Sequence, residues 1–170
     1  KTHLLALAPI HIEPIGLYAG KSKDLKNIKN GATIAIPNDA TNGGRALLLL
    51  QSAGIIQLKK GTGIKATKAD IVSNPHNVKL QELEAAQIPR SLKDVDFAVI
   101  NSNFALTVNL NPVKDALFIE DSKSPYANYL VVRQGDENRP EIQKLVKALQ
   151  SPEVKEYIDK NLKGAVVAAF

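Results

Sequence analysis

Cysteine, methionine and tryptophan are absent from the 170 residues, and the aromatic residues are limited to four Phe and four Tyr. Without cysteine the chain forms no disulfide, has no thiolate nucleophile and offers no cysteine ligand to zinc. The sequence contains no run of about 18 apolar residues, so it predicts no transmembrane helix. The chain starts at Lys1 and shows no signal-peptide pattern, which indicates a processed or trimmed chain.

The charge balance is modestly basic, with 22 Lys and Arg against 17 Asp and Glu and a formal net charge of +5. The lysines are spread along the chain, and few aromatic residues stand beside them to stack on bases. A solvated lysine-rich surface is therefore favoured over a phosphate-binding one, and we expect no nucleic-acid partner.

Short β-rich runs alternate with helical segments, which predicts an α/β fold with helices packed on a sheet. Strands are expected at 4–8, 15–18, 32–36, 78–83, 97–100, 116–119 and 129–133. Helices are expected at 45–53, in short form within 84–93, and twice in the C-terminal part, the second with Ser151 as N-cap.

The segment 32–53 combines a buried strand, a loop at 38–44 rich in turn residues, and a helix that begins at Arg45. A helix start presents free backbone N–H groups, and Arg45 in its first turn would add a bidentate guanidinium for a carboxylate. From this one residue, an ordinary surface arginine in a capped helix is equally consistent.

Two further strand ends carry asparagine, because Asn101 follows the strand 97–100 and Asn128 precedes the strand 129–133. In parallel α/β sheets, ligands collect beyond the carboxyl ends of the strands. A side-chain amide both donates and accepts hydrogen bonds, which suits a zwitterionic amino acid. Asn103 is expected instead to be the N-cap of the next helix.

No set of catalytic or metal-ligating residues stands out. None of His3, His11 and His76 has a second histidine at metal-ligand spacing, so ordinary surface or turn histidines are favoured. Glu120 and Asp121 are neighbours on an extended chain and point to opposite faces, which makes a shared proton unfavourable. We therefore expect no enzyme, no catalytic residue, no metal site and no cofactor.

Five segments carry longer motifs: 11–18 (HIEPIGLY), 36–54 (IPNDATNGGRALLLLQSAG), 80–92 (LQELEAAQIPRSL), 96–106 (DFAVINSNFAL) and 115–132 (DALFIEDSKSPYANYLVV). In this order they resemble the NlpA lipoprotein family, the methionine-binding lipoproteins (MetQ type) of ABC importers. The ending at 164–170 also resembles the C-terminus of the family, so the resemblance covers essentially the whole chain.

The resemblance implies a type 2 periplasmic-binding-protein fold, with one complete lobe and part of the other. It implies a crossing strand and a remnant of lobe 1 at 1–24, lobe 2 at 25–122, and a return strand with the C-terminal helices of lobe 1 at 123–170. The family begins with a lipidated cysteine and most of lobe 1, so we expect this chain to be N-terminally truncated. Its ligand lies between lobes that close by hinge motion.

The implied function is an extracytoplasmic binding protein at the periplasmic or cell-surface face of the membrane, delivering L- or D-methionine to an ABC permease and ATPase complex. Its membrane anchor would be a lipid that this chain lacks. The ligand contacts of the family match Arg45, for the α-carboxylate, and Asn101 and Asn128, for the amino and carboxylate groups. The family commonly has proline where Ala40 stands and an acidic residue where Gly43 stands.

Two other functions stay open. The same zwitterion clamp would serve a binding protein for another amino acid or a small dipeptide, and the fold also occurs in effector-sensing domains of transcription regulators. We expect this chain alone to bind methionine weakly, because half of the implied pocket is missing. We also expect its uncovered sheet edge and apolar faces to favour self-association.

Overall fold

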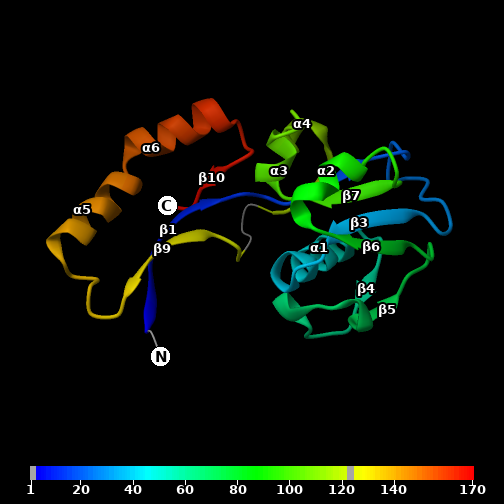
Figure 1. The fold of residues 1–170 in the computed structure, drawn as a ribbon, viewed down its shortest axis with the longest axis horizontal. Coiled ribbons are helices and arrows are strands. Elements are labelled where there is room, and N and C mark those ends of the chain that lie inside the picture. Colours follow the sequence, from blue (N-terminus) through cyan, green and yellow to red (C-terminus); the bar gives the residue numbers. More distant parts are fainter. Residues whose placement is uncertain (1–2, 122–124) are drawn as a thin grey trace. The chain divides into compact units, whose positions relative to one another are not determined.

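The computed structural model describes residues 3–121 and 125–170 and contains two compact units, whose elements are labelled in Figure 1. Unit 1 combines Lys1–Pro14 with Asp121–Phe170, and unit 2 is Ile15–Glu120. Strand β2 (Gly16–Ala19), which the sequence analysis placed in the segment 1–24 of lobe 1, belongs to the sheet of unit 2. The correspondence of the two units to the lobes of a binding protein stays a prediction.

Unit 2 is built on a five-stranded mixed sheet in the order β6-β3-β7-β2-β8. Besides β2, its strands are β3 (Thr33–Pro37), β6 (Lys79–Leu83), β7 (Phe97–Ile100) and β8 (Ala116–Ile119). All five were predicted, β6 from an imperfect alternation of apolar and polar residues and the others from short apolar runs. Strand β3 is parallel to β6 and β7, whereas β2 is antiparallel to β7 and β8. The carboxyl ends of β3, β6, β7 and β8 therefore share one edge with the amino end of β2.

Apolar clusters cover both faces of this sheet. Ile34 and Ile36 of β3 pack into one cluster with the leucines of helix α1, while Ala35 between them packs into the other. Phe97 and Ala98 of β7 divide between the clusters in the same way. Because successive strand residues point to opposite faces, a strand buried on both sides reads as one continuous apolar run.

Helix α1 (Ala40–Ser52) covers one face of the sheet and begins before Arg45 (Figure 1). Asp39 is its N-cap, and the Asp39 Oδ1 accepts a hydrogen bond from the Asn42 backbone N–H at 2.9 Å. The predicted loop over 38–44 is therefore wrong for most of its length. Arg45 lies in the second turn of the helix and not in the first, so it stands away from the free N–H groups.

Gly43 and Gly44 suggest a turn by residue type, yet they lie inside α1, where the helix packs closely against backbone carbonyl groups of neighbouring segments. A Cβ atom at Gly44 would lie 2.9 Å from the Ile64 carbonyl oxygen, and one at Gly43 would lie 3.0 Å from the Pro37 carbonyl oxygen. Neither position tolerates a side chain without movement. Gly43 thus allows α1 to approach the end of β3, and Gly44 allows it to approach the backbone at Ile64.

The rest of unit 2 consists of short elements. A two-stranded antiparallel sheet pairs β4 (Gln57–Leu58) with β5 (Ile71–Ser73). The short helical segments are η1 (Gly63–Lys65), η2 (Lys68–Asp70), η3 (Ala85–Gln87), α2 (Ile88–Ser91), α3 (Ser102–Leu106) and α4 (Pro112–Asp115). The N-cap position of α3 is Asn101, so the prediction of Asn103 as that cap is wrong.

Asp96 joins the strands at the opposite edge of the sheet, just before β7. Its carboxylate accepts hydrogen bonds from the Thr33 backbone N–H at 2.8 Å, the Thr33 hydroxyl at 3.1 Å and the Ser22 hydroxyl at 3.0 Å. These bonds, the one from the Thr33 N–H above all, hold the pKa of the Asp96 carboxyl below its usual range. The charged form therefore ties β3 to the chain that follows β2.

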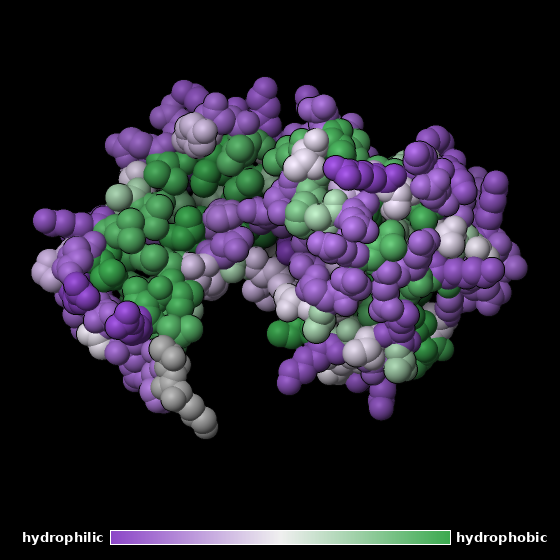
Figure 2. All heavy atoms as spheres, viewed as in Figure 1, coloured by the Kyte–Doolittle hydropathy of each residue, from purple (hydrophilic) through white to green (hydrophobic). Residues whose placement is uncertain are grey.

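Unit 1 has a three-stranded antiparallel sheet in the order β10-β1-β9. Its elements are β1 (Leu4–Ile12), β9 (Asn128–Arg133), α5 (Pro140–Leu149), α6 (Pro152–Tyr157), a π-helical segment η4 (Ile158–Leu162) and β10 (Val167–Ala168). Ser151 caps α6 as predicted, its hydroxyl accepting from the Val154 N–H at 3.3 Å. Neither α5 nor α6 contains a buried residue, and Figure 2 shows apolar side chains on the surface of these elements.

Candidate ligand-binding site

Polar side chains meet at the edge of the unit 2 sheet where β7 and β8 end. Gly16, the first residue of β2, pairs with Ile100 of β7 on one side and with Ile119 of β8 on the other. The next residues along these two strands are Asn101 and Glu120, which therefore stand at the same level on either side of β2. Two strand spacings of roughly 4.8 Å separate their backbones by about 10 Å.

Helix α1 binds to both of these strand ends through one of its faces. Asn42 and Arg45 are three positions apart and therefore lie side by side on the helix. The Asn42 Oδ1 accepts a hydrogen bond from the Asn101 Nδ2 at 2.8 Å, and the Arg45 guanidinium binds the Glu120 carboxylate. The helix thereby fixes two chemically different groups relative to one sheet edge.

The ion pair between Arg45 and Glu120 is buried, with side-chain exposures of 8% and 13%. Arg45 Nε donates to Glu120 Oε1 at 2.9 Å, and Arg45 Nη2 donates to Glu120 Oε2. The same Oε2 accepts the Ile15 backbone N–H at 3.3 Å. Glu120 therefore fixes the guanidinium through its Nε–Nη2 edge and anchors it to the start of β2.

Asn101 contributes a side-chain oxygen that is buried and has no hydrogen-bond donor among the described residues. This oxygen is Oδ1, whereas the Nδ2 of the same amide is bonded to Asn42. Its side chain makes no capping bond to α3, whose N-cap position it occupies. A buried polar atom without a partner costs about 1–3 kcal/mol, so a ligand group that donates to this oxygen gains that amount of stabilisation.

The structure brings Arg45 and Asn101 together in unit 2, while the third predicted residue lies in unit 1. Asn128 is the first residue of β9 rather than the residue before it, is exposed, and pairs with His11 of β1. His11 Nε2 lies 3.0 Å from Glu13 Oε1 in the same unit. A ligand contact by Asn128 stays a prediction.

Two residues of this site were missed by sequence reasoning. Glu120 was considered only as a proton-sharing partner of Asp121, yet it follows the strand 116–119 just as Asn101 follows the strand 97–100. Asn42 was treated as a loop residue. Its spacing of three from Arg45 carries information only once 40–52 is known to be helical.

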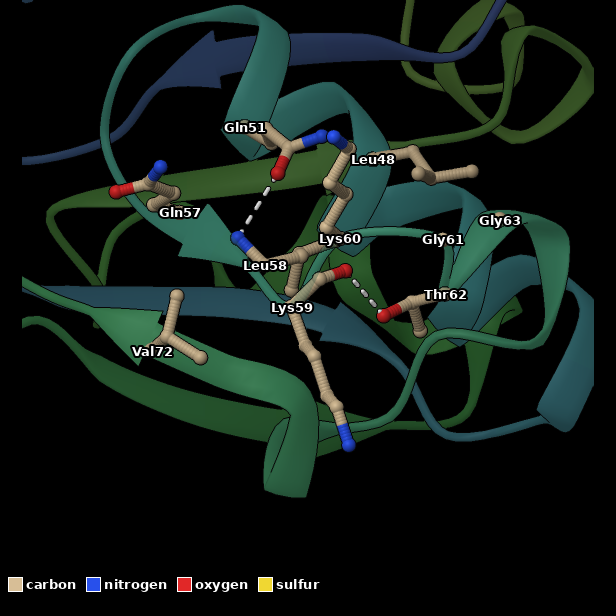
Figure 3. Close-up of a pocket in the computed structure, with 10 residues that line it drawn as sticks. All are labelled: Leu48, Gln51, Gln57, Leu58, Lys59, Lys60, Gly61, Thr62, Gly63 and Val72. Carbon is tan, nitrogen blue, oxygen red and sulfur yellow. Dashed lines mark hydrogen bonds between the residues drawn. The ribbon is translucent and has the colours of Figure 1, made fainter.

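A separate pocket of about 530 Å³ lies at the other end of α1 (Figure 3). Two hydrogen bonds join residues of its lining: the Gln51 Oε1 accepts the Leu58 N–H at 2.8 Å, and the Thr62 hydroxyl donates to the Lys59 carbonyl at 2.6 Å. Asn42, Arg45, Asn101 and Glu120 do not line this pocket.

Within residues 3–121 and 125–170, no three His, Cys, Asp or Glu side chains are grouped so that they could hold a metal ion. Over the same ranges, no helix has the length and apolar character needed to cross a membrane.

The family model of the NlpA lipoproteins matches residues 1–170. The chain belongs to the NlpA lipoprotein family. Among curated NlpA-type relatives, the D-methionine-binding lipoprotein MetQ of Salmonella typhimurium is 45% identical over 98% of this chain and 62% of its own length. The chain thus spans about 62% of the length of that relative.

Solved structures of similar proteins share the fold of this NlpA chain. A nutrient-binding protein of Burkholderia cenocepacia, determined with bound methionine, is 52% identical and has a TM-score of 0.92, with 99% of this chain and 71% of that chain covered. A lipoprotein of Ruminococcus gnavus is 48% identical with the same TM-score and coverage. The expected α/β architecture, a type 2 periplasmic-binding-protein fold, is confirmed.

Proposed function

We propose that this chain is part of an extracytoplasmic substrate-binding protein that delivers methionine to an ABC importer. The proposal is supported by two relatives: MetQ, named for binding D-methionine, and the Burkholderia protein, determined with methionine. The observation in this structure that carries it is the placement of a buried guanidinium and an unpartnered buried amide oxygen at one sheet edge.

These two groups complement an α-amino acid. The Arg45 guanidinium, whose Nε and Nη2 donate to Glu120, binds the α-carboxylate of the ligand in this proposal. The Asn101 Oδ1 accepts a hydrogen bond from the α-ammonium group. Asn128 supplies a third polar contact in this proposal. Recognition of the thioether side chain falls to residues other than these three.

Such a protein carries out no chemical step, and its work is selective binding and transfer. Its partners are the permease and ATPase subunits of the importer, and its place is at the outer face of the cell membrane, held by a lipid. A polar contact gains strength when water is excluded from around it.

Calorimetric titration of the full-length natural protein that contains this chain with L- and D-methionine tests the proposal. We expect saturable binding that Arg45→Ala weakens by about 100-fold or more, because a bidentate charge-assisted contact is lost. The control is Arg90→Ala, which removes an exposed arginine of α2 in the same unit and leaves the affinity unchanged.

Equal affinity of the Arg45→Ala and Arg90→Ala proteins would overturn the carboxylate assignment. A panel of amino acids and dipeptides in the same assay separates the ligands. If another amino acid binds and methionine does not, the assignment of a zwitterion-binding site stands and the assignment of methionine as the substrate is wrong.

A further inference from the structure

We propose that Asp39 and Asn42 set the orientation of the Asn101 side-chain amide, so that its oxygen is the atom left to accept a hydrogen bond from the ligand ammonium. This inference rests on the proposed function, and it names two positioning residues for that site. Neither residue needs to touch the ligand. Their effect passes through Asn101.

The orientation originates at Asp39, because a carboxylate only accepts hydrogen bonds. The Asp39 Oδ1 lies 2.9 Å from the Asn42 backbone N and 3.2 Å from the Asn42 Nδ2, and the Asp39 Oδ2 lies 3.0 Å from the same Nδ2. The two carboxylate oxygens therefore require the NH₂ end of the Asn42 amide on their side. The Asn42 Oδ1 is consequently turned away from Asp39.

Asn42 passes this polarity to the end of β7. Its Oδ1 accepts a hydrogen bond from the Asn101 Nδ2 at 2.8 Å. In the opposite orientation, the Asn101 oxygen would face the Asn42 oxygen with no proton between them. The network thus selects one orientation of the Asn101 amide, in which Nδ2 is used within the protein and Oδ1 is not bonded to any described residue.

The consequence is selectivity for a ligand with a donor at this position. An ammonium group satisfies the buried oxygen, whereas a ligand that lacks this group leaves the oxygen without a partner. Arg45 lies one turn further along α1 than Asn42, so the carboxylate contact and the orientation of the ammonium contact are fixed by the same helix face. Helix α1 therefore positions the group that binds the carboxylate and orients the group that binds the ammonium.

Comparison of methionine with 4-(methylthio)butanoate, the same molecule without its amino group, tests the inference. In the natural protein, Asn42→Ala frees the Asn101 amide to rotate. We expect it to weaken methionine binding by about 10- to 100-fold and to change binding of the analogue by less than about threefold. Thr41→Ala, an exposed change in the same helical turn, leaves both affinities unchanged.

An exchange of the two positioning residues provides the rescue. In the double variant Asp39→Asn and Asn42→Asp, the new Asn donates to the new Asp, which still accepts from Asn101 Nδ2. The polarity at Asn101 is preserved, so we expect methionine affinity within about threefold of the wild type. Thermal unfolding of each variant verifies that it is folded.

The possible results separate the inference from the proposed function. Equal losses for methionine and its analogue in the Asn42→Ala protein would overturn the inference and leave the methionine site in place. So would a double variant that binds as poorly as Asn42→Ala. Wild-type protein that binds neither ligand would overturn the proposed function and the inference together.

Discussion

Glu120 is the residue on which the position of Arg45 depends most directly, because it supplies both bonds to the Nε–Nη2 edge of the guanidinium. Glu120→Gln keeps the shape of the side chain and removes its charge. A buried charge that loses its partner typically costs about 3–5 kcal/mol, and we expect the free energy of unfolding to fall by up to this amount. Urea denaturation at pH 7 measures the change.

The matched control for this residue is Glu84→Gln. Glu84 also follows a strand of the unit 2 sheet, β6, but it is exposed. Its substitution should change the free energy of unfolding by no more than about 0.5 kcal/mol. If both variants unfold at the same urea concentration, the ion pair with Arg45 contributes nothing to stability and the buried-charge argument fails.

At the scale of the element, helix α1 depends on Gly44 for its close contact with the Ile64 carbonyl. Glycine to alanine in an ordinary helix stabilises by about 1 kcal/mol. At Gly44 the added methyl group instead meets backbone at 2.9 Å, and overpacking of this kind costs about 1–3 kcal/mol. We expect Gly44→Ala to lower the free energy of unfolding by up to about 2 kcal/mol and to weaken methionine binding by displacing Arg45.

Denaturant unfolding and calorimetry measure these two effects, with Thr41→Ala as the control at an exposed position of the same helix. A Gly44→Ala protein that is more stable than the wild type would show that α1 has room to accept a methyl group. The glycine would then be incidental to the site.

The same helix shows why the sequence predicted the strands better than the helix start. A short apolar run that is rich in β-branched residues or bounded by turn residues favours a strand buried on both faces, which is why β3 and β7 were found. Gly43 and Gly44 suggest a turn by local chemistry, and only the approach of Pro37 and Ile64 carbonyls explains their presence inside a helix. That approach is a tertiary contact and leaves no periodic signal.

Two of the four residues at the sheet edge, Arg45 and Asn101, were predicted from the sequence, and Asn42 and Glu120 were not. Asn101 was selected because it follows a strand, and Arg45 because it was expected in the first turn of a helix, although it lies in the second. Glu120 was missed because its partner is 75 positions away along the chain, so the pairing depends on the order of strands in the sheet. The orientation of the Asn101 amide depends in turn on Asn42, and no local pattern encodes it.

At the scale of the whole molecule, unit 1 exposes several large apolar side chains. Figure 2 shows them gathered over its strands and helices. They include Leu4, Tyr129, Val131 and Leu145, with exposures of 66%, 47%, 48% and 42%. Tyr129 and Val131 are two positions apart on β9 and therefore lie on one face of the strand. An apolar face of this kind favours contact with a second apolar surface.

We therefore expect the 170-residue chain to self-associate with increasing concentration, and Val131→Lys to shift it towards the monomer by placing a charge on this face. Val72→Lys is the control, since Val72 is an equally simple exposed valine, 62% accessible, on strand β5 of unit 2. Sedimentation velocity over a hundredfold concentration range distinguishes the variants. A wild-type chain that stays monomeric at every concentration would show that the apolar face of unit 1 does not drive association. The same would follow if Val131→Lys and Val72→Lys reduced association equally, because a contact through β9 responds only to the change at Val131.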